Sequence, residues 1–201
     1  FKKLTPVDPN STNPYQLTEA DRTVIGNTTP KFSGGFGLNA TYKGFDMSMF
    51  FNFMYDFDVL NANKIMLTTW ADNKENNFLM NIASDKRWRN FDDMGNEIRY
   101  SPEVLAEFNK NATMWNPTSI GRPICMSYAV EDGSFLRLNS ATLGYTLPSV
   151  WTKKVGLSKV RFYVSGNNLF TLTGYSGYDP EVNIATGLTP NIDYNRYPRS
   201  R

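Results

Sequence analysis

Apolar and polar side chains alternate along two neighbouring stretches of the chain. In residues 31–42 the apolar positions share one parity: Phe32, Phe36, Leu38, Ala40 and Tyr42. In residues 46–58 they are Met47, Met49, Phe51, Phe53, Tyr55 and Phe57, with Phe50 and Met54 as two exceptions. Successive side chains of a strand point to opposite faces, so each stretch predicts a strand with one apolar and one polar face. The short link at 43–45 contains a glycine and predicts an antiparallel hairpin.

The composition of these apolar faces favours lipid over a protein core. Phe, Met and Tyr dominate them, whereas β-branched residues are typical of strands in soluble sandwiches. Each stretch also has about the ~9–11 residues that a tilted strand needs to cross hydrocarbon. We therefore expect seven side chains to face lipid: Phe32, Phe36, Leu38, Met47, Met49, Phe51 and Phe53. Their polar neighbours, such as Asn39 and Asn52, are expected to face a lumen.

A second hairpin is predicted from residues 131–147 and 159–173, joined by a short basic link. In the first of these stretches the apolar parity slips near Asn139 and Ser140, which predicts a β-bulge. An alternative is that the upper half projects beyond the bilayer, where no lipid-facing rule applies. In the second stretch Val160, Phe162 and Val164 share one face with Gly166. Four aromatic residues fall near the short-turn ends, where a membrane girdle is expected: Tyr42, Phe45, Tyr145 and Trp151.

Residues 59–126 form a long loop between the hairpins. They lack a strand period and include Trp70, Trp88 and Trp115. Residues 76–89 predict a short helix within the loop, whose basic face at Lys86, Arg87 and Arg89 we interpret as solvated. The acidic run at 92–97 departs from the spacing of a calcium loop and favours a turn.

Composition and charge exclude several classes of function. The chain has 201 residues, a net charge of +2, one cysteine and no histidine. The small charge argues against a nucleic-acid partner, and the absent histidine excludes Ser/His or Cys/His catalysis and histidine-based metal sites. Asp56 and Asp58 have no visible acid/base partner, so we expect no enzyme, no cofactor and no metal. No run of residues approaches the 18 apolar residues of a membrane-spanning helix.

Four motifs in order carry a resemblance to a known family. They are EDGSFLRL at 131–138, LGYTLP at 143–148, RFYVSGNNLF at 161–170 and YSGYDPEV at 175–182. Together they resemble the C-terminal barrel segment of SusC/RagA-family TonB-dependent outer-membrane transporters. The resemblance implies an all-β fold: about four strands of a large antiparallel transmembrane β-barrel, with long extracellular loops and short periplasmic turns. It also implies that the plug domain and the final strand are absent from residues 1–201.

The same resemblance implies the protein's location and partners. We expect the outer membrane of a Gram-negative, Bacteroidetes-like cell, with a SusD-like surface lipoprotein as a lid. The TonB complex would act through parts of the protein absent here, and the substrate would be an oligosaccharide or a peptide. The lipid bilayer is a further partner. An alternative of another class is a soluble all-β carbohydrate-binding module.

Aromatic and acidic loop residues are the candidates for contact with a substrate or lid. They are Trp70, Trp88, Trp115, Tyr175, Tyr178 and Asp179. Rings stack on sugars and carboxylates accept hydrogen bonds from hydroxyl groups. For the tail loop after residue 173, which also contains Glu181, a structural role is favoured, because Ser-Gly and Asp-Pro are common turn formers.

Overall fold

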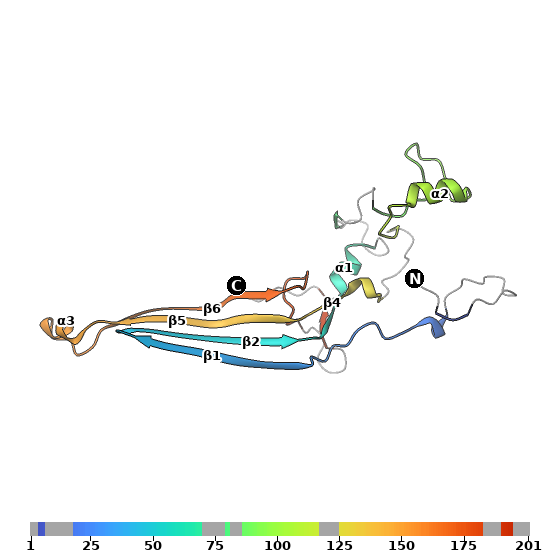
Figure 1. The fold of residues 1–201 in the computed structure, drawn as a ribbon. Helices are drawn as coiled ribbons and strands as arrows, with labels where there is room; N and C mark the ends of the chain where they lie inside the picture. Colours follow the sequence, from blue (N-terminus) through green and yellow to red (C-terminus); the bar gives the residue numbers. More distant parts are fainter. Residues whose placement is uncertain are drawn as a thin grey trace.

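Four long strands form one antiparallel sheet. The computed structural model describes residues 4–6, 18–69, 79–80, 86–116, 125–182 and 190–194 (Figure 1). The strands are β1 (Phe32–Tyr42), β2 (Phe45–Tyr55), β5 (Phe135–Thr146) and β6 (Arg161–Thr173), in the order β1-β2-β5-β6. The prediction of an all-β fold with four long antiparallel strands is confirmed.

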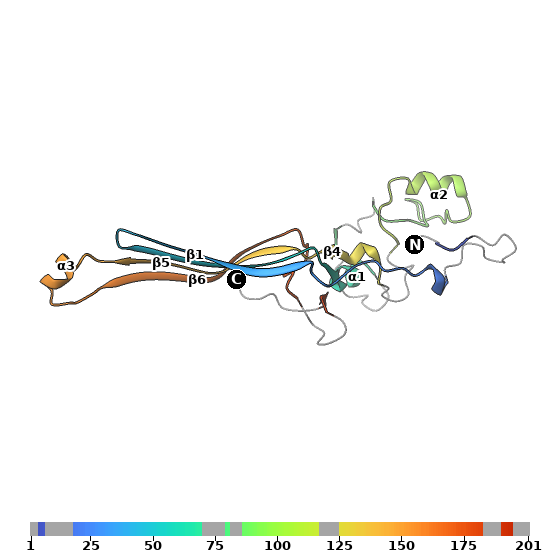
Figure 2. The ribbon, with the colours of Figure 1, turned by 60° about the horizontal axis from the view of Figure 1, so that its bottom comes forward.

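A small second sheet lies at one end of the long strands. Its order is β4-β3-β7, with β3 at Asp58–Asn61, β4 at Val130–Asp132 and β7 at Ile192–Asp193. The helices are short: α1 (Ala62–Met66), α2 (Pro102–Asn109) and α3 (Ser149–Lys154), with 3₁₀ turns η1 (Glu19–Asp21) and η3 (Ser127–Ala129). Figures 1 and 2 show a short-turn end, with α3 and the β1–β2 turn, and an opposite loop end, with α1, α2 and the small sheet.

The β1–β2 hairpin closes through two residues with positive φ. Lys43 has φ 45° and Gly44 has φ 90°, and the paired strands run in register from Tyr42 opposite Phe45 to Phe32 opposite Tyr55. Positive φ at both central residues matches the right-handed twist of the strands. A Cβ on Gly44 would also lie 2.8 Å from the carbonyl oxygen of Thr146, so the turn lies close against β5.

Cross-strand pairing joins the apolar positions into one continuous face. One row across the sheet is Phe36, Phe51, Leu138 and Phe170, and a second row is Leu38, Met49, Ala141 and Gly166. The seven side chains predicted to face lipid all lie on this face and are exposed or half-buried. The rings of Phe36 and Phe51 stack with their centroids 4.9 Å apart. A soluble sandwich would cover this face with a second sheet, whereas the small sheet lies at the strand ends (Figure 1).

The predicted bulge is confirmed, and it keeps the face continuous. Three residues of β2, from Met49 to Phe51, lie opposite four residues of β5, from Ala141 to Leu138. The corresponding span of β6 runs from Gly166 to Phe170 and contains Asn168, whose φ is +51°. These extra residues reverse the parity of β5, so its apolar positions return to the same face. The Leu169 side chain lies over Gly166, where a Cβ would be only 2.6 Å away.

The two exceptions to the alternation in β2 have separate causes. The Phe50 ring lies on the polar face over Gly35 of β1, where a Cβ would approach its Cζ to 2.8 Å. Met54 packs against the buried cluster at the loop end. An apolar side chain on the polar face is thus explained by a missing neighbouring side chain in one case and by local burial in the other.

An ion pair crosses three strands of the polar face near the short-turn end. Arg161 donates through Nε to Asp46 Oδ1 at 3.0 Å and through Nη2 to Asp46 Oδ2 at 2.5 Å. Gly144 of β5 lies between them, and a Cβ there would be 2.6 Å from the guanidinium. Glycine is therefore needed at this position for the side chains to meet above the intervening strand.

Four aromatic residues line up across the short-turn end. Tyr42, Phe45, Tyr145 and Phe162 occupy consecutive paired positions on the apolar face. The sequence predicted the first three of them, whereas Phe162 was assigned only to an apolar face. Trp151 lies apart from this row, exposed in α3. A row of aromatic rings at one height is the arrangement expected at a membrane interface.

The predicted strands at 46–58 and 131–147 are each interrupted near the loop end. Asp56 has φ +58°, so β2 ends at Tyr55 and the chain restarts as β3. Gly133 separates β4 from β5, and its N–H donates to the Phe57 carbonyl at 2.8 Å. The two segments turn out of the long sheet together, which carries Phe57 into a core instead of toward lipid.

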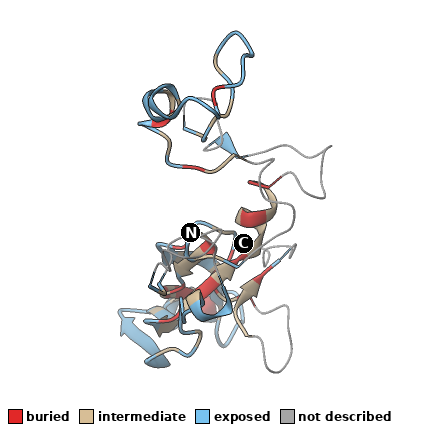
Figure 3. Cartoon of the chain, turned by 90° about the vertical axis from the view of Figure 1, so that its right-hand side faces the viewer, coloured by how far each residue is buried: buried red, intermediate tan, exposed pale blue. Residues whose placement is uncertain are grey.

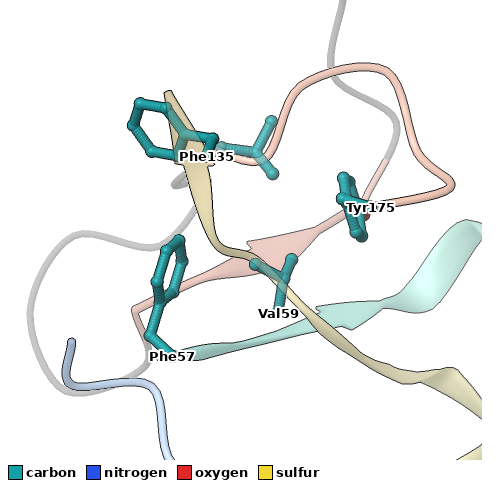
Figure 4. Close-up of a cluster of buried hydrophobic side chains, with 5 residues drawn as sticks. Phe57, Val59, Phe135 and Tyr175 are labelled. Atoms are coloured by element: carbon teal, nitrogen blue, oxygen red, sulfur yellow. The ribbon is translucent and has the colours of Figure 1, made fainter. Parts of the chain in front are cut away.

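The buried core sits where the two sheets meet. Its cluster is Phe57, Val59, Phe135, Tyr175 and Val182, and Figure 4 shows four of these side chains turned toward one another. Figure 3, which views the chain from the loop end, shows buried residues in the strands there and in the loop that carries α2. Among the described residues, burial is concentrated at the loop end. The outer strands β1 and β6 are almost entirely exposed along their length.

The long loop contains the helices α1 and α2. Of the predicted helix at 76–89, residues 76–78 and 81–85 lie outside the described residues, Met80 has 3₁₀ conformation, and residues 86–89 are not helical. There Trp88 N–H donates to the Met114 carbonyl at 2.8 Å, beside a bridge between Arg87 and Met114. The helix that forms nearby, α2, begins with Pro102, which is favourable in a first turn.

We expect Phe51→Arg to impair assembly of the full-length protein in a bilayer. A charged side chain on a lipid-facing position near the midplane costs about 2–4 kcal/mol. Ser48→Arg is the matched control, since Ser48 is exposed on the polar face of the same strand. The measurement is the fraction of protein that reaches the heat-modifiable, folded form on gels. Equal losses in both variants would contradict the assignment of the faces.

Candidate functional site

A buried arginine lies at the centre of the loop end. Arg137 of β5 is only 3% exposed, and each guanidinium nitrogen has a protein partner. Nε donates to Thr171 Oγ1 at 3.1 Å, Nη1 to Glu181 Oε2 at 3.0 Å and Nη2 to Asp179 Oδ1 at 2.5 Å. Thr171 is its cross-strand neighbour on β6. The planar fork of an arginine suits two separate carboxylates at fixed angles.

The two carboxylates belong to the tail loop that follows β6. Asp179 Oδ1 also accepts from the Glu181 N–H at 2.9 Å, and Pro180 between them is fully buried. Removing two anions and a cation from water is costly unless each remains paired, so this triad holds the loop in one position. It fastens residues 179–181 of the tail loop to the polar face of the sheet.

Tyr175 fastens the beginning of the tail loop to the small sheet. Its hydroxyl donates to Asp193 Oδ2 at 2.7 Å, and Asn63 Nδ2 donates to Asp193 Oδ1 at 3.1 Å. Burial, followed by the hydrogen bond to Asp193, raises the pKa of the Tyr175 hydroxyl well above its ordinary range. The tyrosine ring lies close over Gly177, where a Cβ would be 2.3 Å from the ring.

Glu131 of β4 connects the tail loop with the long loop. Its carboxylate accepts from Ser176 N–H at 2.9 Å, from Ser176 Oγ at 2.8 Å and from Lys64 Nζ at 3.0 Å. Burial raises the pKa of Glu131, but these hydrogen bonds outweigh burial and hold it below its ordinary value of about 4.5. The Lys64 ammonium also lies 4.4 Å from the centroid of the Tyr128 ring.

These contacts form three groups, each of which includes a residue of the tail loop, and together we call them the anchor network. It comprises Lys64, Glu131, Arg137, Tyr175, Ser176, Asp179, Glu181 and Asp193. Its members come from α1, β4, β5, the tail loop and β7. The network can hold both loops on the ends of the long strands, and the described contacts include no arrangement of groups for proton transfer to a substrate.

The structure places the six candidate contact residues in different surroundings. Tyr175 and Asp179 are buried, and their polar groups are engaged within the anchor network. Trp115 is half-buried, and its Nε1 donates to the Thr68 carbonyl at 3.1 Å. Trp88 and Tyr178 are exposed on the long loop and the tail loop, respectively. The sixth candidate, Trp70, lies outside the described residues.

Sequence reasoning missed the residues that organise this site. Arg137 lies between two leucines in a strand, and a lone charge in such a run is a usable signal of a buried ion pair. Glu131 and Asp193 gave no comparable signal, because their partners are distant in sequence. The same holds for Asn63 and Lys64, whose partners Asp193 and Glu131 are also distant in sequence.

The acidic run at 92–97 forms a hydrogen-bonded turn. Asp92 Oδ1 accepts from the N–H groups of Met94 and Asn96, and Asp92 Oδ2 accepts from Asn96 Nδ2. The Asn96 side chain is the largest cause that lowers the pKa of Asp92. Among the described residues, no three acidic, cysteine or histidine groups are arranged to hold a metal ion. Within the same residues, every helix is too short or too polar to cross a membrane.

We expect Arg137→Met to release the tail loop. The substitution leaves Asp179 and Glu181 without their buried cation, and breaking such a pair costs about 3–5 kcal/mol. Hydrogen exchange of the Tyr175 and Glu181 amides in the full-length protein measures the local opening free energy. Arg161→Met is the control, since it removes a more exposed ion pair that lies at the other end of the sheet and does not contact the tail loop. Unchanged exchange in Arg137→Met would show that the triad does not hold the loop.

We also expect acid to weaken the contact between Glu131 and the tail loop. A carboxylate whose folded pKa is lowered stabilises the fold above its ordinary pKa, and this contribution is lost as pH falls through the lowered value. Exchange of the Ser176 amide, which bonds Glu131 directly, should therefore accelerate below about pH 4.5 beyond the intrinsic pH effect. Glu131→Gln should abolish this extra acceleration. The same acid response in both proteins would assign it to another group.

Comparison with known proteins gives matches over most of the chain, although no family model matches. The chain is 34% identical over 192 residues to TonB-dependent receptor P3 of Formosa agariphila, covering 92% of this chain and 17% of that protein. It is 38% identical over 77 residues to TonB-dependent receptor SusC of Bacteroides thetaiotaomicron, or 36% of this chain and 7% of SusC. The chain therefore spans about a sixth of the first relative's length.

Solved structures share the fold. The RagAB peptide importer in its closed-closed state aligns with a TM-score of 0.65 at 24% identity, over 91% of this chain and 18% of that chain. The open-open state aligns with a TM-score of 0.64 at 23% identity, over 94% and 18%. The continuous apolar face of the long sheet agrees with these matches, because a barrel wall needs one apolar face. The chain is a β-barrel segment of the SusC/RagA family of TonB-dependent receptors.

Proposed function

We propose that this chain is part of an outer-membrane transporter that imports oligosaccharides or peptides. A SusD-like surface lipoprotein serves as its lid, and the TonB complex supplies energy through other parts of the receptor. The observation that carries the proposal is the uninterrupted apolar face of the long sheet, opposite a face of hydroxyl, amide and paired charged groups. Such a division suits a barrel wall between lipid and a water-filled lumen.

The exposed apolar side chains of this face support contact with lipid. Phe32 is 56% exposed, Phe162 is 64% exposed and Leu172 is 60% exposed. Exposed apolar groups over such a length would promote aggregation in water. In hydrocarbon the same groups are well solvated, and the strand backbone is already hydrogen-bonded to its neighbours.

Two open edges support a larger barrel around this sheet. β1 and β6 each pair with one long strand, so their outer backbone groups require partners. In hydrocarbon each unpaired group costs several kcal/mol. Strands from the rest of the receptor supply these partners, in a barrel of ~22 strands as in plugged outer-membrane transporters.

The polar face supports passage of hydrophilic solutes. Asp46 is paired with Arg161, and Lys31 is paired with Asp56 at the opposite end. Ser48, Asn39 and other uncharged polar groups occupy the region between. The paired charges leave little net field along this part of the wall, and the substrate is set by the whole lumen, the plug and the lid.

The exposed aromatic residues of the loops remain candidates for contact with substrate or lid. Trp88 and Tyr178 present rings at the loop end, which we place on the extracellular side. RagAB is named a peptide importer and the matched relatives are named receptors, so both substrate classes are retained. The anchor network keeps the tail loop and the long loop at the barrel rim, where either class would first arrive.

We expect the two ends of the sheet to react from opposite sides of the outer membrane. With Cys125→Ser to remove the native thiol, Met94→Cys should react with an impermeant maleimide on intact cells lacking the lid. Met94 is 90% exposed in the long loop. Ser158→Cys, at the short-turn end, should react only after the outer membrane is permeabilised. The reverse pattern would refute the topology and the import function that depends on it.

Uptake assays separate the substrate classes. Cells that carry or lack the receptor gene are supplied with fluorescent oligosaccharides or peptides, and accumulation in the periplasm is measured. Loss of uptake for one class, restored by the wild-type gene and also lost when TonB is absent, is the expected result. Uptake of both classes unchanged by deletion would contradict the proposal.

A further inference from the structure

The turn that contains α3 presents apolar and basic side chains together. Four apolar residues are strongly exposed: Val150, Trp151, Val155 and Leu157 are 67%, 61%, 71% and 51% exposed. Residues 147–160 also contain Lys153, Lys154 and Lys159, which are exposed, and contain no acidic residue. A periplasmic turn that faced only water would have no need for four exposed apolar groups.

The backbone of this turn is held firmly. Thr152 is 2% exposed, its Oγ1 donates to the Ser149 carbonyl at 3.3 Å, and its own carbonyl accepts from Leu157 N–H at 3.0 Å. Gly156 has φ +76°, which closes the loop after the helix. Because Thr152 points inward, the apolar and basic side chains are displayed on the outer surface of a defined turn.

The turn continues the apolar face of the sheet. Leu147 N–H donates to the Val160 carbonyl at 2.9 Å, which joins the turn directly to β5 and β6. The next pair on the same face of these strands is Tyr145 and Phe162, the end of the aromatic row. Figures 1 and 2 both show α3 projecting beyond the β1–β2 turn. The strands therefore lead from the hydrocarbon region to a surface at the level of the headgroups.

We propose that the α3 turn is a membrane-surface anchor that binds anionic phospholipid in the periplasmic leaflet. This inference rests on the membrane barrel and topology of the proposed function. Trp151, Val150 and Val155 enter the boundary between headgroups and acyl chains, and Lys153 and Lys154 contact lipid phosphates. Tryptophan at an interface and lysines near an anionic surface are both favourable there. The complete absence of acidic residues from the turn matches a negatively charged surface.

A first experiment measures where the turn lies in the full-length receptor. The receptor carries Cys125→Ser, is labelled at Val155→Cys with a bimane fluorophore and is placed in nanodiscs of phosphatidylcholine and phosphatidylglycerol. Headgroup spin labels are expected to quench the bimane more strongly than labels deep in the acyl chains. A second labelled protein, Phe51→Cys, reports the position of the strand.

The two labels distinguish failure of this inference from failure of the proposed function. Quenching of Phe51→Cys by acyl-chain labels, with none at Val155→Cys, would overturn the anchor alone. The anchor alone would also be overturned if Val155→Cys were shielded from both lipid and water, because another protein segment would then cover the turn. An aqueous environment at Phe51→Cys would overturn the proposed membrane barrel, and the anchor with it.

A second experiment tests the lipid charge. Spin-labelled phosphatidylglycerol should quench Val155→Cys more than spin-labelled phosphatidylcholine does, and added salt should reduce the difference. Lys153→Gln with Lys154→Gln should lower the enrichment of phosphatidylglycerol by about fivefold for each lysine lost. The matched control is Lys86→Gln with Lys110→Gln, two exposed lysines of the long loop. Equal quenching by the two lipids, or equal effects of both double variants, would overturn the proposal.

Discussion

A sheet in contact with lipid must keep one face apolar while every backbone group stays hydrogen-bonded. Both demands meet at the bulge near residues 139–140, where β5 gains one residue relative to β2. Without that residue, the apolar side chains of one half of β5 would turn to the polar face. The added span in β6, with Asn168 in the left-handed region, continues the adjustment. The rows of apolar side chains across all four strands depend on this local irregularity.

In a barrel wall one face of the long strands contacts lipid and the other faces the lumen. The buried core of the described residues therefore forms outside the middle of the long sheet. It lies at the loop end, where β2 and β5 both leave the sheet and carry Phe57 and Val59 inward. The buried ion triad around Arg137 and the hydrogen bond from Tyr175 to Asp193 surround this core. A buried ion pair adds little net stability but requires one defined geometry. We therefore interpret these charges as fixing the position of the loop. The loops are thereby fastened to strands whose own positions are set by neighbours in the barrel.

The two ends of the sheet thus differ in chemistry. At the loop end, charges are buried in pairs and hold segments that are distant in sequence, such as Arg137 and Asp179. At the short-turn end, lysines and apolar groups of the α3 turn are exposed beside an aromatic row. The first arrangement suits loops that must keep one fixed shape. The second arrangement suits contact with a fluid lipid surface, where charge and apolar area matter and an exact fit of shapes does not.

The sequence by itself determined the strands and their faces. Alternation in β1 and β2 reported which side chains share a face, because the period of two is a property of the extended backbone. The slip of parity near Asn139 was likewise enough to predict the bulge. The four motifs were sufficient to indicate the family. In the long loop, however, the predicted helix at 76–89 is absent from the described residues 86–89, where pairing with Met114 prevails over local preference.

Only the tertiary structure decided where the chain is buried and which polar groups meet. Arg137 and Asp179 are 42 residues apart, and Glu131 meets Lys64 across 67 residues. No local pattern encodes such pairs, since they depend on where two loops return to the sheet. The sequence did not reveal the interruptions at Asp56 and Gly133 for the same reason. Phe57 continues the alternation of the strand before it, and its burial depends on the pairing of β3 with the distant segment β4. In the sequence Tyr175 and Asp179 are ordinary loop residues. Their buried partners, Asp193 and Arg137, are identified only by the tertiary structure.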